Sequence, residues 1–530
     1  MSGFKDDQPA GLSRRSLLKA GAALSVLMAT GHAGANQGKR PPAPGLKIRK
    51  AFNKLSVSEI ESIRTGIRVM KERPESDPTS WWYQANIHGT YTTPTEENAK
   101  KTWSNCPHGT YHFLPWHRMY LYYFEKILRE AARDPNLALP YWNYTDPDYL
   151  DLPEAFRIPA SSLNPLWYQD RLPFRDEATS TDLNIGAGDK MPWALIDPTG
   201  TMEFINFCSS VQKAGNDFAS AKADWIHFTT TFGALESQPH NNVHLLVGGL
   251  VAAASGDFLP GAQLAIGSMS DINKAANDPV FWFHHSNIDR LWDHWISLGG
   301  GRSDPIEEQE WMQTGFTFFE PDGSPVQVRI ADVLDSEKLG YRYDTLELTA
   351  AGQASQQQNG QDVAKITSCT ATAVTAALAA DHGGHAAEQK VAGQATGSGQ
   401  EPALLHKGGR ASAKVMPPVA AVPEKDSKRR VILHLQGISA PMHSFLLPVF
   451  ANLPSDEKPS LDSPYLVGTI SMFGATLKMQ PMKFDRTFDV TEALRKQVEK
   501  GLYSGGEITV TVAGTVPQQV TVDRIRIEYR

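Results

Sequence analysis

The sequence predicts a mainly α fold, in which a helix bundle forms the core and a C-terminal β-sandwich domain follows it. Between residues 47 and 345, apolar residues recur at spacings of three and four, as in helices buried on one face. A stretch rich in Ala, Gly, Gln and Ser comes next, and apolar runs of strand length follow it. The predicted parts are a signal peptide at 1–35, a short linker at 36–46, a core domain at 47–345, a flexible linker at 346–428 and a β domain at 429–530.

The first 35 residues have the pattern of an export signal. Arg14 and Arg15 precede an apolar run from Ala20 to Ala29, and small residues follow around Ala33, which is typical of a twin-arginine signal peptide. The run is too short to cross a membrane, and no later segment is long and apolar enough. We therefore expect export by the twin-arginine translocase to the periplasm or the medium, with no membrane anchor.

Periodicity predicts the main elements of the core and the β domain. The predicted helices are Val57 to Lys71, Pro115 to Arg133, Pro239 to Val247 and Pro279 to Ser297. The predicted strands are Arg430 to Leu435, Ile508 to Val512 and Val520 to Tyr529. Within the long linker, Ala371 to Ala380 has the composition of a short helix, but the rest cannot bury enough apolar surface to fold.

Composition excludes several classes of protein. The net charge of −7 provides no basic excess for binding nucleic acid. Three cysteines can form neither a disulfide framework nor an all-thiolate zinc site. Histidine is the remaining supply of metal ligands, and many of the 16 histidines lie between His88 and His294.

A first group of candidate ligands lies near the predicted helix at 239–247. His240 and His244 are four residues apart, so a helix places both rings on one face, close enough to share a metal ion. On the next predicted helix, His285 is the expected third ligand, and Asp289 is expected to accept the other N–H of its ring. His284 points about 100° away and is expected to be a packed or supporting residue.

A second group precedes the helix at 115–133. His117 falls in the first turn of that helix, His108 lies on the preceding loop, and His88 is the upstream core histidine left to complete the set. Three neutral imidazoles for each metal, without carboxylate or thiolate, suit copper, zinc or iron. The donors do not choose among these metals.

Two long motifs resemble known metal signatures. The stretch from His108 to Glu125, with HGTYHFLPWHR, and the stretch DPVFWFHHSNID from Asp278 to Asp289 are similar to the two copper signatures of the tyrosinase and polyphenol oxidase family. The resemblance implies a bacterial member with a binuclear type 3 copper centre and dioxygen as co-substrate. It assigns the first copper to His88, His108 and His117, and the second to His240, His244 and His285.

The resemblance also assigns roles near these ligands. Cys106 lies two residues before His108, as in members that carry a thioether between that cysteine and the histidine ring. Glu236 and Asn241 match the glutamate and asparagine that hold a water for deprotonating a monophenol. By the same matching, the side chains expected to contact the substrate ring are Leu245 and Ile272.

The C-terminal part extends the resemblance. Tyr341 to Asp344 is similar to the tyrosine motif that closes the catalytic core, and Lys483 to Val490 is similar to the C-terminal domain of plant-type members. In those enzymes this domain covers the active site until proteolysis. We therefore expect a latent proenzyme cut in the 346–428 linker, or else a permanently attached stabilising domain. The candidates for the covering side chain are Phe445, Met472 and Phe473.

The resemblance implies ortho-hydroxylation of monophenols and oxidation of o-diphenols to o-quinones, with small phenols as substrates and a copper chaperone as a partner. A catechol oxidase without monophenolase activity is the nearest alternative. A haemocyanin-like oxygen carrier, an o-aminophenol oxidase and a non-catalytic binding protein are further ones.

Overall fold

The structure, a computed structural model, describes part of the chain. The described residues are 45–171, 185–208, 217–222, 232–249, 267–349, 367–368, 403–405, 409–417, 422, 429–439, 445–460, 463–473, 483–514 and 520–529. The predicted signal peptide, most of the 36–46 linker and the short helix expected at Ala371 to Ala380 lie outside these residues. Residues from Lys47 to Arg530 belong to one unit, to which all contacts below belong.

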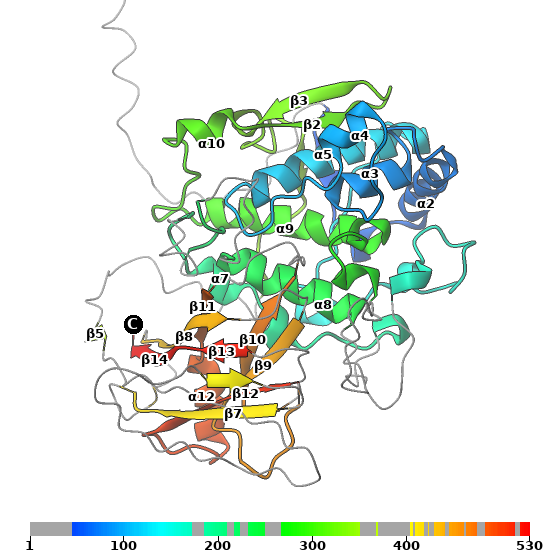
Figure 1. The fold of residues 1–530 in the computed structure, drawn as a ribbon. Helices are drawn as coiled ribbons and strands as arrows, with labels where there is room; N and C mark the ends of the chain where they lie inside the picture. Colours follow the sequence, from blue (N-terminus) through cyan, green and yellow to red (C-terminus); the bar gives the residue numbers. More distant parts are fainter. Residues whose placement is uncertain are drawn as a thin grey trace, which may run out of the picture. The chain divides into compact units, whose positions relative to one another are not determined.

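Helices dominate the region up to residue 345, which Figure 1 colours from blue to green. Its α-helices are α2 (Val57–Glu72), α3 (Trp81–His88), α4 (Glu97–Thr102), α5 (Phe113–Ala132), α6 (Trp193–Ile196), α7 (Thr199–Met202), α8 (Asn242–Gly248), α9 (Val280–Ser297) and α10 (Gln309–Gln313). The short strands of this region are β1 (Lys47–Arg49), β2 (Gly315–Phe319), β3 (Pro325–Arg329) and β4 (Tyr341–Tyr343). The predicted helical core is confirmed.

Local sequence explains why α2 begins and where it packs. The side chain of Ser56 accepts from the backbone N–H of Glu59, and Glu59 accepts from the backbone N–H of Ser56, which forms a capping box. Midway along the helix, Gly66 lies against α5, where an added Cβ would approach the backbone oxygen of Leu128 to 2.8 Å. Only a residue without a side chain allows this close contact between the two helices.

The helices α5 and α9 form the centre of the core and lie next to each other (Figure 1). Trp282 of α9 stacks on Phe124 of α5, with ring centroids 3.5 Å apart and an interplanar angle of 11°. Both rings are buried, so this contact removes a large apolar area from water. The pairing fixes where His117 of α5 and His285 of α9 lie.

The helix predicted at Pro239 to Val247 differs in detail from the structure. A π-helical segment, η6 (Glu236–Asn241), leads into α8, and Gln238 within it has an extended conformation (φ −146°, ψ 120°). Pro239 therefore follows a kink and does not open a regular helix. His240 and His244 still share one face, because the chain is helical from Asn241 onward.

The start of α9 is shifted by one residue from the prediction. Pro279 occupies the N-cap position, and the carboxylate of Asp278 accepts from the backbone N–H of Val280 at 3.1 Å. Asp278 also accepts from both Nε and Nη2 of the buried Arg171, at 2.8 and 2.7 Å. Asp278 therefore both accepts from the first turn of α9 and anchors a neighbouring loop.

The C-terminal region consists mainly of strands, coloured yellow to red in Figure 1. Its elements are β5 (Thr367–Ser368), β6 (Ala403–Leu405), β7 (Gly409–Val415), β8 (Val431–Ser439), β9 (Phe445–Ala451), β10 (Leu466–Met472), β11 (Lys483–Asp489), α12 (Thr491–Glu499), β12 (Ile508–Gly514), β13 (Val520–Val522) and β14 (Arg524–Tyr529). One sheet has the order β10-β9-β12-β7, and the other has the order β5-β14-β8-β13-β6 with β11 paired to β8.

Apolar side chains from both sheets belong to one buried cluster. Val449 and Val510 come from the four-stranded sheet, and Leu433 and Ile527 come from the six-stranded sheet. The predicted strands are thus present, with a break at Asp523 that divides the last one into β13 and β14. Strand pairing does not define the angle between the sheets, so the sandwich arrangement stays a prediction.

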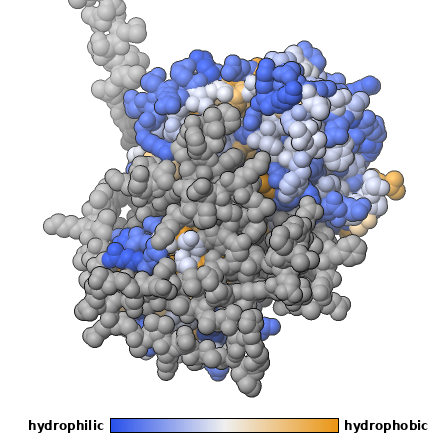
Figure 2. All heavy atoms as spheres, viewed as in Figure 1, coloured by the Kyte–Doolittle hydropathy of each residue, from blue (hydrophilic) through white to orange (hydrophobic). Residues whose placement is uncertain are grey.

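The exposed side chains of the helical region fit an aqueous environment on the face that Figure 2 draws. The helical region shows mostly hydrophilic side chains on the face drawn in Figure 2. Among the described residues, the helices are too short or too polar to traverse a lipid bilayer.

Candidate metal centre

The first histidine group is brought together from a helix end, a loop and a helix start. His88 is the last residue of α3, His108 lies on the loop before α5, and His117 is in the first part of α5. The Nε2 atoms of His88 and His108 are 3.3 Å apart, and the ring centroids of His108 and His117 are 5.8 Å apart. All three side chains are buried.

The second histidine group lies on η6, α8 and α9. The ring centroids of His240 and His244 are 4.6 Å apart, as the spacing of four residues predicts. The Nε2 atoms of His244 and His285 are 3.3 Å apart. These three side chains are also fully buried.

The two groups face each other where α5 lies next to α9. The rings of His117 and His285 stack with centroids 4.1 Å apart and an angle of 6°, and His108 lies 5.5 Å from His240. The structure therefore brings all six sequence-predicted ligands into one cluster. Within each group, one potential ligand atom per residue lies within 4.8 Å of the others.

Backbone carbonyls fix the orientation of three of these rings. The Nδ1–H groups of His88, His117 and His244 donate to the oxygens of Ile272, Phe113 and Met269, at 3.0, 2.8 and 2.8 Å. Each ring then presents the lone pair of Nε2 to the centre of the cluster. This is the arrangement by which outer partners set the tautomer of metal-bound histidines.

Burial keeps the imidazoles neutral. Desolvation lowers the pKa of His88 to about 3 and lowers the pKa values of the other five rings well below their usual range. Neutral imidazole is the form that binds metal ions. At neutral pH the six rings are therefore uncharged and can bind metal cations.

His284 lies closer to the second group than the helical spacing predicts. Its potential ligand atom lies within 4.8 Å of those of His240, His244 and His285. Its Nδ1 is 2.8 Å from the hydroxyl of Tyr144, while its buried Nε2 has no partner among the described residues. The supporting role predicted for His284 stays a prediction, and Tyr144 is the neighbour that the sequence did not reveal.

The role predicted for Asp289 is wrong. Asp289 does not contact the ring of His285, whose Nδ1 has no partner among the described residues. Its carboxylate instead accepts from Arg118 at 2.6 Å and Arg49 at 3.3 Å, and from the hydroxyls of two tyrosines. Two buried guanidinium groups attract a carboxylate more strongly than a neutral imidazole does.

The tyrosine motif and β1 build this ion-pair network. Tyr341 and Tyr343 of β4 donate their hydroxyls to Asp289, each at 2.6 Å, and Arg49 of the parallel strand β1 lies 3.6 Å from the centre of the Tyr341 ring. Arg49 also donates to Glu125 of α5 at 2.7 Å. The motif therefore joins β1 and β4 to the two helices that carry His117 and His285.

Glu236 is buried directly behind the first group. Its Oε1 is 2.9 Å from Nδ1 of His108 and accepts from the backbone N–H of Gly109 at 2.9 Å, while Ser220 donates to Oε2. Desolvation raises its pKa to about 8, and the hydrogen bonds from Ser220 and Gly109 oppose that rise. Ser220 lies 16 residues before Glu236 and carries no motif, so only the fold reveals it.

Asn241 is engaged on one side only. Its Oδ1 accepts from Nδ1–H of His240 at 2.9 Å, and its buried Nδ2 has no partner among the described residues. Glu236 thus contacts His108 of the first group, and Asn241 contacts His240 of the second group.

The predicted substrate-contact residues are both buried in the core. Leu245 follows His244 on α8, and Ile272 supplies the carbonyl that accepts from His88. Gly89 lies against Ile272, where an added Cβ would approach the Ile272 oxygen to 2.5 Å. Ile272 is therefore held tightly beside the first group.

A C-terminal aromatic ring covers the cluster. Phe473, directly after β10, stacks on His244 with centroids 3.9 Å apart at 18°, and lies 5.5 Å from His108 and 5.8 Å from His240. Its side chain is fully buried. Of the three covering candidates, the side chains of Phe445 and Met472 lie outside the described residues.

Cys106 is buried next to the first group. Its Sγ lies 3.5 Å from Nε2 of His117 and belongs to the same set of potential ligands as His108. Burial raises the pKa of the thiol well above its usual value, so a reactive thiolate is disfavoured. The two other cysteines are remote from this cluster in the sequence.

Comparison with known proteins gives matches along most of the chain. Residues 78–298 match the family described as the common central domain of tyrosinase, residues 305–352 match the polyphenol oxidase middle domain, and residues 383–530 match a domain of unknown function. Tyrosinase HcTyr1 of Hahella sp. (strain CCB-MM4) is 31% identical over 350 residues, which is 61% of this chain and 69% of that one.

Plant proteins are similar over a smaller share of their length. Chloroplastic polyphenol oxidase A1 of Vicia faba is 31% identical over 58% of this chain, but the match covers only 49% of that protein. The chain is also similar in fold to the structure of latent apple tyrosinase, with a TM-score of 0.57 at 22% identity. The alignment covers 92% of this chain and 98% of that one. A functional unit of octopus hemocyanin is similar in fold too, with a TM-score of 0.51 at 17% identity. That alignment covers 91% of this chain and 99% of the hemocyanin unit.

Proposed function

Because the chain belongs to the tyrosinase and polyphenol oxidase family, we propose that it oxidises phenols with dioxygen at a pair of copper ions. The proposed reactions are ortho-hydroxylation of monophenols and oxidation of o-diphenols to o-quinones. The observation that carries the proposal is the convergence of two buried groups of three histidines.

The donor set fits two copper ions. Each group offers neutral imidazole nitrogens, without a competing carboxylate, in the donor chemistry that suits copper. The buried Nε2 of His240 has no protein partner among the described residues, and a bound metal ion would satisfy it. One ion would be held by His88, His108 and His117, and the other by His240, His244 and His285.

When bound, the copper pair supplies the two-electron oxidation of a phenol by dioxygen. The chain itself holds the rings in place through the carbonyls of Phe113, Met269 and Ile272. Its buried surroundings exclude water, and Leu245 and Ile272 offer apolar contact for a substrate ring.

A monophenol must lose its proton before it is hydroxylated, and we assign the base to Glu236. A carboxylate with a pKa near the operating pH is well matched to this task, and burial raises the pKa of Glu236 to about 8. The free Nδ2 of Asn241 is a hydrogen-bond donor that could orient a water between base and substrate.

One observation favours the narrower alternative, an o-diphenol oxidase without monophenolase activity. The carboxylate of Glu236 already has three partners, namely His108, Gly109 and Ser220, which compete with a water for its lone pairs. A diphenol needs less help from a base, because its hydroxyls lose their protons as it is oxidised.

We further propose that the protein is a latent proenzyme. Phe473 occupies the face of His244 where a phenol ring would have to approach, and two polar contacts hold β10 against the core. Thr469 donates to the side chain of Asn242 at 3.0 Å, and Ser471 donates to the backbone oxygen of Ser237 at 3.4 Å. Cleavage in the 346–428 linker would then permit release of the cover.

Copper content and oxygen uptake test the function. The full-length protein should bind two copper ions and consume oxygen slowly with a monophenol or an o-diphenol, and faster after limited proteolysis of the linker. Absence of uptake from copper-loaded, trimmed protein would favour an oxygen carrier or a binding protein instead.

The Glu236→Gln variant tests the base. Loss of a general base lowers turnover by about 10²- to 10⁴-fold, so monophenol turnover should fall by that order while diphenol turnover changes little. Equal losses for both substrates would reject the assignment, and absent monophenol turnover in the wild type would identify the o-diphenol oxidase.

Three further proposals concern maturation. We propose that residues 1–35 direct a bacterial protein through the twin-arginine translocase to the periplasm or the medium, with copper loaded by a chaperone. We also propose a thioether between Cys106 and His108. Its formation removes two hydrogen atoms, so mass spectrometry of the peptide pair detects it.

A further inference from the structure

A polar and aromatic path leads away from the second histidine group. The hydroxyl of Tyr144 lies 2.8 Å from Nδ1 of His284, and the two rings are 5.5 Å apart. Trp142 continues the path, with its ring centroid 5.2 Å from that of Tyr144 at 84°. Tyrosine and tryptophan are the side chains most easily oxidised by one electron and then restored.

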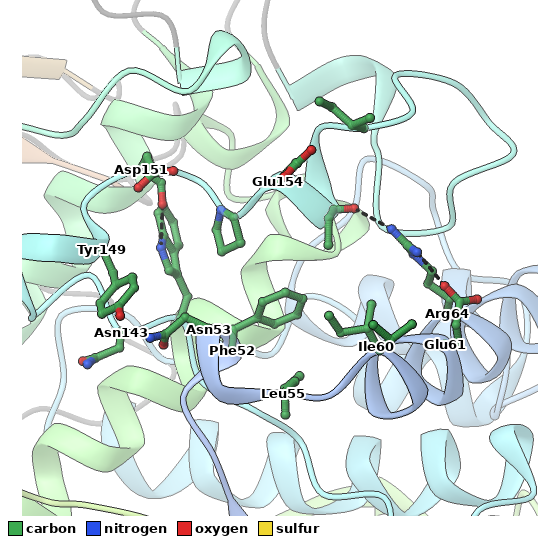
Figure 3. A pocket seen from close by; sticks show the side chains of 15 residues that line it. Phe52, Asn53, Leu55, Ile60, Glu61, Arg64, Asn143, Tyr149, Asp151 and Glu154 are labelled. Carbon is green, nitrogen blue, oxygen red and sulfur yellow. Dashed lines mark hydrogen bonds and ion pairs between the residues drawn. The ribbon is translucent and has the colours of Figure 1, made fainter.

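The path ends at a pocket on the surface of the core. The pocket has a volume of about 480 Å³, and Phe52, Trp142 and Tyr149 line it. Figure 3 shows Phe52 and Tyr149 among its walls, together with the amides of Asn53 and Asn143. Tyr149 is 40% exposed, so a dissolved molecule can reach the pocket.

A second aromatic path starts at His117, and its branch toward Trp81 ends inside the protein. Trp116 lies 4.9 Å from His117, and Tyr120 and Trp282 extend the chain of rings toward Trp81. Trp81 is fully buried. Trp142 is almost as buried, with 1% of its surface exposed, but it lines the surface pocket, so a molecule in that pocket can contact it.

We propose that Tyr144 and Trp142 form a redox relay that carries oxidising equivalents from the metal centre to a reductant in the surface pocket. The inference rests on the proposed function, because copper chemistry supplies the oxidant. The position of Phe473 explains why a relay is needed. While this ring covers the cluster, a phenol cannot reach an oxidised metal centre and reduce it directly. The relay would then protect the ligands from oxidation.

The electrons and protons balance over one cycle. With copper bound and oxidised by hydrogen peroxide, an electron would leave Tyr144 for the site while its phenol proton shifted along the hydrogen bond to Nδ1 of His284. Trp142 would return the electron to Tyr144, the proton would move back, and a reductant in the pocket would restore Trp142. Two such passes would supply the two electrons that reduce one hydrogen peroxide to two waters. The site would take up two protons from solvent, and one diphenol would release two protons to solvent as it becomes a quinone.

The pocket selects the class of reductant. Its aromatic walls suit a flat ring, and the amides of Asn53 and Asn143 can contact hydroxyl groups. The carboxylates of Glu61, Asp151 and Glu154 outnumber the single guanidinium of Arg64, so an anion is disfavoured. We therefore assign the pocket to a neutral diphenol. Hydroquinone is a suitable probe because it is not an o-diphenol substrate.

The test maps protein oxidation. Copper-loaded full-length protein is treated with hydrogen peroxide, with or without hydroquinone, and oxidised residues are located by peptide mass spectrometry alongside the copper retained. In the wild type we expect oxidation at Trp142 and Tyr149, suppressed several-fold by hydroquinone, with the ligand histidines spared. In Trp142→Phe, oxidation should move to those histidines, and hydroquinone should no longer protect.

Two further variants separate a relay from a structural role. Trp142→Tyr keeps an oxidisable ring and should restore the wild-type map. Trp295→Phe is the control, because Trp295 is equally buried and donates its indole N–H to a backbone carbonyl, but lies off the path. Identical maps for wild type and Trp142→Phe, or an equal change in Trp295→Phe, would overturn the relay. Failure of the wild type to bind copper would instead reject the proposed function.

Discussion

Arg118 donates through Nε to Oδ1 of Asp289 at 2.6 Å, and this buried ion pair joins α5 to α9 beside the metal cluster. Arg118 directly follows His117, and Asp289 lies one helical turn after His285. The pair therefore sets the register at which the rings of these two histidines stack.

The Asp289→Asn variant should be strongly destabilised. It leaves two buried guanidinium groups, those of Arg49 and Arg118, short of one counter-charge, and breaking a buried pair costs about 3 to 5 kcal/mol. Denaturant unfolding measures this loss. In the control Glu97→Gln, which breaks an exposed pair with Lys100, the loss should stay below about 1 kcal/mol. Similar losses of stability in both variants would show that the buried ion pair of Asp289 contributes no more than an exposed one.

The Phe473→Ala variant should activate the uncleaved protein. Removing the ring opens the face of His244, so oxygen uptake with an o-diphenol should rise toward that of the trimmed wild type. Phe488→Ala is the matched control, because Phe488 is buried among the strands of the C-terminal region. Equal activation by both variants would indicate general loosening of the cover rather than removal of a plug.

The Ser220→Ala variant should shift the pH dependence of monophenol turnover. The Ser220 hydroxyl donates to Glu236 and lowers the pKa of that carboxyl, so its loss raises the pKa and moves the acid limb to higher pH. The shift should be about one to two pH units, because a hydrogen bond to a charged group contributes about 1.5 to 3 kcal/mol. Ser270→Ala, which removes a buried hydroxyl bonded to Gly249, should leave the limb unchanged.

The Asp304→Asn variant should make stability less sensitive to pH. Burial raises the pKa of Asp304 from 3.8 to about 6, so its charged form destabilises the fold. The wild type therefore loses stability as pH rises from about 4 through 6, by up to about 3 kcal/mol at 1.36 kcal/mol per pKa unit. Asparagine can still accept from the indole N–H of Trp292.

Unfolding temperatures at pH 5 and 7.5 test this prediction. The variant should exceed the wild type by more at pH 7.5 than at pH 5. A constant difference between the two proteins would show that the charge of Asp304 has no effect on folding.

The sequence predicted most of the core, because helix periodicity and capping are local properties. The bounds of α2, α5 and α9 agree with the predicted helices to within two residues. The spacing of His240 and His244 was also enough to place their rings together. Three of the six histidines, namely His108, His117 and His285, could be named because they lie in the two long motifs.

Local spacing does not predict a contact where residues distant in the chain compete for the same partner. The spacing of His285 and Asp289 is correct for a contact within one helix, yet Arg49 and Arg118 approach from other elements and attract the carboxylate. Local spacing does not reveal such competition, because charge pairing in a buried site depends on which elements meet there.

By itself, the sequence determined which residues can bind metal and which segments form helices, since both depend on residue type and short spacing. Only the tertiary structure decided that Phe473 stacks on His244, that Ser220 donates to Glu236, and that Tyr144 and Trp142 connect His284 to the surface. The contacts of Phe473 with His244 and of Tyr144 with His284 join residues separated by long stretches of chain, and only packing of the folded core brings them within reach.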